Sequence, residues 1–347
     1  MTTKKKPVLL VLLLCGLAGG SGAKKGAEAR RGKVETTDRA APVLWRDPAD
    51  IQSRNLFYGA GGASHEPHGR FTFVKEDLDG SNPKFTVTDA DGMKWKVKLG
   101  TEARPETAAS RLLWAVGFSS DEDYFISRLR VDGITTPLHR GWKMRMRDGS
   151  FPDVRLKREP KQREKLGNWR WRDNPFTGTR ELNGLRVLMA LINNWDLKDS
   201  NTAILRDKYG EDGSTEVVYE VSDLGASFGA TGLDMEHQKE KGNLNRYRHS
   251  QFITSIRANE VSFATPSRPT ILAIFNPHEF FSRMGLRRIG RGIPRSDARW
   301  MGQLLGRLSD QQIRDIFSAA GYSPKEVDGF TQVLEQRITR LNRLEED

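Results

Sequence analysis

The stretch that most constrains this chain is 191–229, in which two acidic residues each stand at the end of an apolar run. These residues are Asp196 and Asp223. Between them, the β-prone segments 202–206 and 217–221 flank the turn-rich linker DKYGEDG, a pattern that predicts a short β-hairpin. Because a hairpin returns the chain on itself, we expect the two aspartates to converge on one site.

A pattern of metal-binding and phosphate-binding residue types accompanies the first aspartate. Asp196, Lys198 and Asn201 form the pattern Asp-x-Lys-x-x-Asn. Phosphoryl transfer requires Mg²⁺ held by hard oxygen ligands and a second carboxylate that orients the attacking hydroxyl. Asp223 and Asn201 suit the first task and Asp196 suits the second. Two loop aspartates and a capping asparagine remain the structural alternative, because each short motif is common by chance.

The two motifs together resemble a known superfamily. Asp196 to Asn201, DLKDSN, resembles the catalytic loop of protein-kinase-like proteins, and Asp223-Leu224-Gly225 resembles their metal-binding Asp-Phe-Gly segment. The resemblance implies an α+β fold with a strand-rich N-lobe and a helical C-lobe, and it implies ATP with Mg²⁺ or Mn²⁺ as cofactors. It assigns catalysis to Asp196 and Lys198, and metal binding to Asn201 and Asp223. Trp195 departs from the arginine that many kinases carry before the aspartate.

An earlier hairpin supplies the lysine that the resemblance requires. Strands are predicted at 84–88 and 94–99, joined by the turn sequence DADG. In the second strand Lys96 and Lys98 share one face. Lys98 resembles the strand lysine that neutralises nucleotide phosphates in kinase-like proteins, and Lys96 stays open as the alternative.

The helix that follows supplies a matching glutamate. Pro105 marks a helix start, and Glu106 lies in its first turn. Glu106 resembles the helix glutamate that orients the strand lysine in kinases, although a helix dipole favours a first-turn carboxylate in any protein. The short interval between Lys98 and Glu106 is similar to the atypical HipA-like, phosphoinositide-kinase-like and secreted-kinase-like branches.

A glycine-rich segment precedes these elements. The sequence FYGAGGASHEPHGRFTF at 57–73 contains Gly59, Gly61 and Gly62. Glycines let backbone N–H groups approach phosphate oxygens, so these three are candidates for a nucleotide-covering loop. A plain surface loop is an equal alternative, because the spacing departs from Gly-x-Gly-x-x-Gly.

The N-terminus has the pattern of an export signal. Three lysines precede a short apolar run, and small residues follow, which predicts a signal peptide over 1–23 and a periplasmic or secreted protein. Cys15, the only cysteine, leaves open a lipid-anchored form, and an uncleaved anchor is the other possible link to a membrane. Residues 24–43 predict a disordered linker.

The remaining sequence sets the expected domain plan. We expect the N-lobe at 44–130 and the C-lobe at 131–347, with helices at 179–193, 270–284, 295–308, 310–320 and 324–345 and a polar, irregular segment between 230 and 265. The formal net charge of +11 favours anionic partners such as nucleotides. The basic run 144–172 contains Trp169 and Trp171, which suit single-stranded nucleic acid, but nucleic acid is not the favoured partner.

Three functional hypotheses follow. The first is an exported, atypical kinase-like phosphotransferase that moves the ATP γ-phosphate to a hydroxyl on a protein, a glycan or a small molecule. The second is a nucleotide-binding pseudokinase or inactive envelope interaction module. The third is a nucleotidyl transferase in which the nucleotide lies reversed. The sequence does not identify the acceptor.

Overall fold

The computed structural model describes residues 41–80, 82–207, 215–230, 241–265 and 285–344. The expected signal peptide, most of the expected linker and the whole of the expected helix at 270–284 lie outside these residues. Residues 38–347 form one unit, and all that follows concerns that unit.

The N-terminal part is built on a six-stranded sheet with the order β5-β7-β4-β3-β2-β6. Its strands are β2 (Phe71–Asp77), β3 (Lys84–Thr88), β4 (Lys94–Leu99), β5 (Asp123–Leu129), β6 (Val131–Asp132) and β7 (Phe151–Arg158). All neighbours are antiparallel except β2 and β6. The predicted hairpin is therefore present as β3 and β4. Because β6 and β7 belong to this sheet, it extends past the lobe boundary expected at residue 130.

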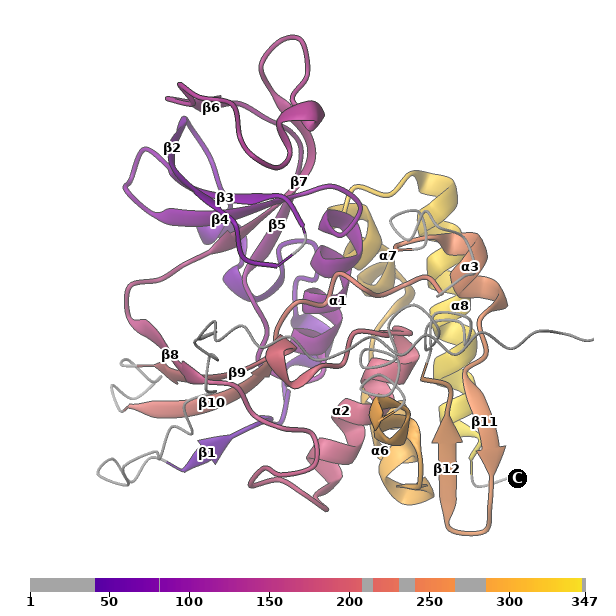
Figure 1. Cartoon of the computed structure of the whole chain (residues 1–347). Helices are drawn as coiled ribbons and strands as arrows, with labels where there is room; N and C mark the ends of the chain where they lie inside the picture. Colours follow the sequence, from indigo (N-terminus) through magenta and orange to yellow (C-terminus); the bar gives the residue numbers. More distant parts are fainter. Residues whose placement is uncertain (1–40, 81, 208–214, 231–240, 266–284, 345–347) are drawn as a thin grey trace, which may run out of the picture. The chain divides into compact units, whose positions relative to one another are not determined.

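Helix α1 (Ala103–Ala115) connects this sheet to the rest of the unit. It contacts β5 and β7 on one side and α7 (Asp310–Ala319) on the other, as Figure 1 shows. The apolar side chains of α1 belong to the larger of two hydrophobic cores, whereas the sheet has a smaller core of its own. Because the chain segment between β4 and α1 is short, the start of α1 lies beside the end of β4.

A second sheet has the order β1-β10-β9-β8. Its strands are β1 (Pro42–Val43), β8 (Arg163–Gly167), β9 (Thr202–Asp207) and β10 (Glu216–Val221). β9 and β10 are antiparallel, with Thr202 opposite Val221, and they form the hairpin predicted between the two aspartates. β1 pairs parallel with β10, so the last residues of the expected linker form a strand.

The C-terminal part is mainly helical. Its helices are α2 (Arg180–Leu191), α3 (Leu244–His249), α6 (Arg295–Leu305), α7 and α8 (Pro324–Asn342). Ser309 with Gln312 and Ser323 with Glu326 form capping boxes at the starts of α7 and α8, the helices expected at 310–320 and 324–345. The segment expected to be irregular instead contains α3 and two strands, β11 (Ile253–Ile256) and β12 (Glu260–Phe263). These two strands form a small sheet with β13 (Ile293–Pro294).

Short 3-10 helices complete the described elements. They are η1 (Ile51–Ser53), η2 (Gly59–Gly61), η3 (Ala63–His65), η4 (Trp142–Met144), η5 (Asp199–Asn201) and η7 (Arg287–Gly290). Among the residues described, none of the helices combines the length and the apolar character needed to span a membrane. The α+β class, with a strand-rich N-terminal part and a helical C-terminal part, is confirmed.

The two tryptophans of the basic run lie inside the protein. Trp169 is 3% exposed and Trp171 is 7% exposed, and both belong to the larger core. The Trp169 indole donates to the carbonyl oxygen of Glu220 at 2.9 Å. Their rings are therefore buried against the protein and are not available to stack on nucleic-acid bases.

Candidate active site

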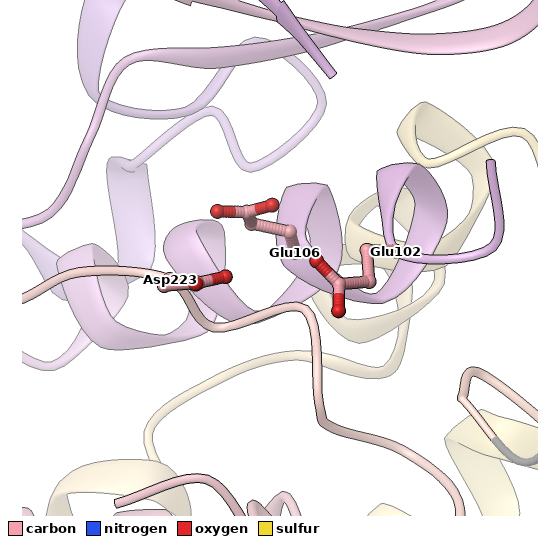
Figure 2. Close-up of side chains that lie close together, drawn as sticks. All are labelled: Glu102, Glu106 and Asp223. Atoms are coloured by element: carbon pink, nitrogen blue, oxygen red, sulfur yellow. The ribbon is translucent and has the colours of Figure 1, made fainter. Parts of the chain in front are cut away.

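Three carboxylates surround the side-chain nitrogen of Lys98. Lys98 Nζ lies 2.7 Å from Glu106 Oε2, 2.8 Å from Asp223 Oδ1 and 3.2 Å from Glu102 Oε2. Figure 2 shows the three carboxylates converging from the start of α1 and from the segment after β10. The structure thus brings Lys98, Glu106 and Asp223 together, from positions up to 125 residues apart in the chain.

Local sequence explains how the lysine and the two glutamates meet. Lys98 is the penultimate residue of β4, and Glu102 directly precedes the first residue of α1. Glu102 and Glu106 are four residues apart, a spacing that places two side chains on the same face of a helical turn. Because α1 begins five residues after Lys98, this face points back at the lysine. Lys98 is only 7% exposed as a result.

The electrostatics of the cluster favour a fixed, charged lysine. One oxygen of each carboxylate lies within 4.8 Å of the others, a geometry that could hold a metal ion. The Lys98 ammonium, however, contacts all three. Burial alone would lower the pKa of Lys98, but Glu106 and Asp223 raise it above its ordinary value. The ammonium therefore supplies the positive charge that these carboxylates require, and the cluster is an ion-pair network.

Asp223 differs from the two glutamates in its exposure. Its side chain is 45% exposed, whereas those of Glu102 and Glu106 are 6% and 3% exposed. Burial of the Asp223 carboxyl opposes ionisation, yet the Lys98 ammonium outweighs it and holds the pKa of Asp223 below its usual range. Asp223 is therefore the ionised member of the cluster that a ligand can reach.

The backbone around Asp223 is held in an uncommon conformation. Asp223 has φ of 56°, in the left-handed region that non-glycine residues rarely adopt. Leu224 is buried, and a Cβ atom on Gly225 would lie 2.6 Å from Glu102 Cβ. Only glycine therefore allows the Asp-Leu-Gly segment to pass this close to Glu102. Residues in such conformations are concentrated at functional sites.

Backbone hydrogen bonds place the predicted catalytic loop beside Asp223. The amide of Ser222 donates to the carbonyl oxygen of Asn201 at 2.9 Å, and the amide of Trp195 donates to Ala226 at 3.3 Å. Asn201 Nδ2 donates to the carbonyl oxygen of Asp196 at 2.7 Å. Lys198 Nζ lies 3.3 Å from Asp196 Oδ1. The two motifs thus run alongside each other, as the hairpin between them predicted.

Sequence reasoning missed four charged residues of the site. Arg155, on β7, lies 2.9 Å from Glu106 Oε1 and 3.4 Å from Asp123 Oδ1. Lys241 forms an ion pair with Glu102. The spacing of Glu102 from Lys98 was a signal that could have been used. No sequence pattern pointed to Arg155, Asp123 or Lys241, because only the packing of distant elements brings these residues to the site.

The glycine-rich segment lies elsewhere. A Cβ on Gly59 would meet the Arg111 side chain, and one on Gly61 would meet Tyr124 Oη at 2.2 Å, while Gly62 has an open surrounding. None of the residues around Lys98 is among these neighbours. The segment packs on α1 and β5, where close approach of side chains explains the small residues at Gly59 and Gly61.

The structure also separates the two candidate lysines. Lys96 Nζ pairs with Glu159 Oε1 at 2.9 Å, and its side chain is 41% exposed. Lys98 faces the start of α1 although both lysines are on one face of β4. Lys98, rather than Lys96, therefore contacts Asp223.

A pocket of about 240 Å³ lies between the two sheets and reaches Ser222, directly before Asp223. Residues of β4, β7, β8, β9 and β10 line it, and the segment 159–160 between β7 and β8 forms part of its wall. Its charged side chains are largely paired, as in Lys157 with Asp121 at 3.2 Å and Arg158 with Glu122 at 3.4 Å. A polar slot between two sheets thus adjoins the Lys98 cluster.

Comparisons with known proteins identify similar structures only. No protein-family model and no curated protein matches the chain. Among solved structures, the chain is similar to a Helicobacter pylori proinflammatory kinase, CtkA, with 12% identity over 81% of this chain and 99% of that chain and a TM-score of 0.43. It is also similar to the golgi casein kinase, with 11% identity over 81% of this chain and 74% of that chain and a TM-score of 0.35.

Proposed function

We propose that this protein is an exported, atypical kinase-like phosphotransferase that uses ATP and a divalent metal ion. One observation carries the proposal: a buried strand lysine contacts both a helix glutamate and the half-exposed aspartate of an Asp-Leu-Gly segment. Structural ion pairs do not require one carboxylate of the three to be accessible and held at positive φ. A site that presents an ammonium and a carboxylate to a phosphate–metal ligand does require an accessible carboxylate in a fixed conformation.

The predicted residues of the Lys98 cluster and of the catalytic loop each receive a role in this proposal. Lys98 binds nucleotide phosphate oxygens, and Glu106 keeps its ammonium in place. Asp223 and Asn201 offer a carboxylate and an amide oxygen, the hard donors that Mg²⁺ and Mn²⁺ prefer, so the donor set fits such an ion. The ion, when bound, neutralises charge on the phosphates.

The acceptor chemistry is assigned to the loop beside Asp223. Asp196 orients the acceptor hydroxyl and accepts its proton, which makes the hydroxyl oxygen a better nucleophile. Lys198, 3.3 Å from Asp196, stabilises negative charge on the transferring phosphoryl group. Because charge in this transition state is spread over phosphoryl oxygens, positioning and electrostatic stabilisation suffice for catalysis.

The pocket between the sheets is the proposed place for the nucleoside. It adjoins Ser222, so a base and ribose there would direct the phosphates towards Asp223 and Lys98. Its paired charges offer hydrogen-bond donors and acceptors. Leu205 and Ala203 supply apolar contact on the β9 side.

The decisive experiment uses ATP labelled at the γ-phosphate or at the α-phosphate, with Mg²⁺ or Mn²⁺ and a panel of protein, glycan and small-molecule acceptors. We expect transfer of the γ-label, and loss of transfer in Asp223→Asn. Transfer of the α-label would establish nucleotidyl transfer instead. Binding of ATP with no transfer to any acceptor or to the protein itself would favour the pseudokinase, and absence of binding would exclude both nucleotide-dependent functions.

Export and membrane attachment are separate proposals. They rest on the lysine-rich and apolar pattern of residues 1–23 and on Cys15. Mass spectrometry of the protein isolated from its source measures both. A mature N-terminus at residue 24 would support cleavage and export, a lipid-modified Cys15 would support the anchored form, and an intact N-terminus in soluble cytoplasm would refute export.

A further inference from the structure

Asp123, the first residue of β5, is a buried acid that the proposed reaction does not use directly. It is 3% exposed. Among the described residues, neither of its carboxyl oxygens has a hydrogen-bond partner. The nearest cation is Arg155, whose Nη1 lies 3.4 Å from Asp123 Oδ1. A carboxylate so buried and so weakly satisfied is costly to ionise.

A continuous series of ionic contacts links Asp123 to Lys98. Arg155 Nη1 faces Asp123, and Arg155 Nη2 lies 2.9 Å from Glu106 Oε1. The other oxygen of Glu106 lies 2.7 Å from Lys98 Nζ. Asp123 and Glu106 therefore share one guanidinium, so the charge on Asp123 alters what Arg155 offers to Glu106.

Other charged groups around Asp123 also affect its ionisation. Glu106 and Arg111 lie on α1, Arg155 and Lys157 lie on β7, and Asp121 lies just before β5. Arg111 donates to the backbone carbonyl oxygen of Asp123 at 2.8 Å. Burial raises the pKa of Asp123 to about 7. Arg155 by itself would lower this pKa, but the repulsion of Asp121 and Glu106 offsets much of that effect. The carboxyl is thus neutral in mild acid and charged in mild alkali.

We propose that Asp123 is a positioning residue whose ionisation, acting through Arg155 and Glu106, weakens the binding of nucleotide phosphates at Lys98. This inference rests on the proposed function. When Asp123 is neutral, the charge of Arg155 is balanced by Glu106 alone, and the cluster presents more positive charge to the phosphates. When Asp123 is ionised, it adds one buried negative charge near the same site.

Coulomb's law sets the size of the effect. For one unit charge about 10 Å from a phosphate charge, at an effective dielectric constant of about 20, the interaction changes affinity by roughly tenfold, and screening reduces this. We therefore expect the nucleotide to bind about threefold to tenfold more weakly at pH 8.5 than at pH 6.0 because of Asp123. The titration of the nucleotide adds its own pH dependence, which is common to all variants.

The test measures the Kd of ATP with Mg²⁺ by calorimetry at both pH values, for the full chain and for Asp123→Asn. The variant mimics the neutral acid, so the ratio of its Kd at pH 8.5 to that at pH 6.0 should be threefold to tenfold smaller than the wild-type ratio. Asp123→Ser, neutral and smaller, should behave in the same way if the asparagine variant folds poorly. The matched control is Asp148→Asn, because Asp148 lies at the surface away from the pocket and hydrogen bonds from Ser150 hold the pKa of Asp148 below its usual range.

The outcomes separate this inference from the function on which it rests. Equal ratios in the wild type and in both Asp123 variants would overturn the role of Asp123 while leaving nucleotide binding intact. A reduced ratio in Asp148→Asn of the same size would also overturn it, because the effect would then come from general loss of charge. Failure of the wild type to bind ATP at either pH would overturn the proposed function, and this inference with it.

Discussion

Replacing Glu106 and Asp223, one at a time, separates the structural part of the Lys98 cluster from the part that contacts the ligand. Glu106→Gln keeps the size of the side chain and removes the charge that two cations share, at 2.7 Å and 2.9 Å. Removing one partner of a buried ion pair costs about 3–5 kcal/mol, because the remaining charge is left buried and poorly paired. We expect a loss of this size in the free energy of unfolding.

Asp223→Asn should behave differently. The Asp223 side chain is 45% exposed, and Lys98 keeps Glu102 and Glu106 as partners without it. Exposed ion pairs contribute about 0.2–1 kcal/mol, so the free energy of unfolding should fall by less than about 1 kcal/mol. Turnover should nevertheless be abolished in both variants, since one removes the proposed metal ligand and the other removes the group that orients Lys98.

The assay is urea unfolding at pH 7, followed by tryptophan fluorescence, alongside transfer of the γ-label. Asp148→Asn is the matched control, because Asp148 pairs with Arg128 and Arg130 at the protein surface, and it should leave stability and turnover unchanged. If Asp223→Asn destabilised the protein as much as Glu106→Gln, or kept full turnover, the division of the cluster into a buried support and a ligand-facing acid would be refuted.

Three further predictions concern the same site. Lys98→Ala should raise the Kd for ATP by at least tenfold, whereas Lys96→Ala should raise it less, because Lys96 lines the proposed nucleoside pocket but pairs with Glu159 and does not contact Asp223; calorimetry measures both. Gly225→Ala should lower the urea midpoint and weaken ATP binding, because the new methyl group would displace Glu102, and Gly167→Ala is the matched control, because Gly167, like Gly225, is not at positive φ and its added Cβ would meet no atom within 4 Å. Since Lys98 holds the pKa of Asp223 low despite burial, the stability from this carboxylate should be complete above about pH 5 and be lost as the pH falls through its folded pKa, so the difference in urea midpoint between wild type and Asp223→Asn should shrink as the pH falls below about 4; a constant difference would contradict this.

Local sequence signals were sufficient for the elements that carry the site. The alternation at 94–99, the turn sequence between β3 and β4, and the capping residues of α7 and α8 each act within a few residues, so the pattern predicts the structure directly. The hairpin between Asp196 and Asp223 also follows from local residue types. For this reason the positions of Lys98, Glu106 and Asp223 in their elements could be predicted.

Positions that depend on contacts between distant segments could not be predicted in the same way. Gly59 and Gly61 have the composition of a phosphate-binding loop, but they pack against Arg111 and Tyr124 because of how the N-terminal segment crosses α1 and β5. β7 lies between β5 and β4 in the first sheet although it follows β5 and β6 in the chain. Strand order depends on which surfaces are buried together, and no short pattern encodes it.

The amino-acid sequence alone determined the chemical groups of this protein and the elements that present them: an ammonium on a strand, a carboxylate at a helix start and two acids joined by a hairpin. Only the tertiary structure decided that Lys98 rather than Lys96 meets Asp223, and that Arg155 ties Glu106 to a buried Asp123. The physical reason is that propensities and caps act between neighbours in the chain. The burial and pairing of a charge depend on side chains that folding brings from far away.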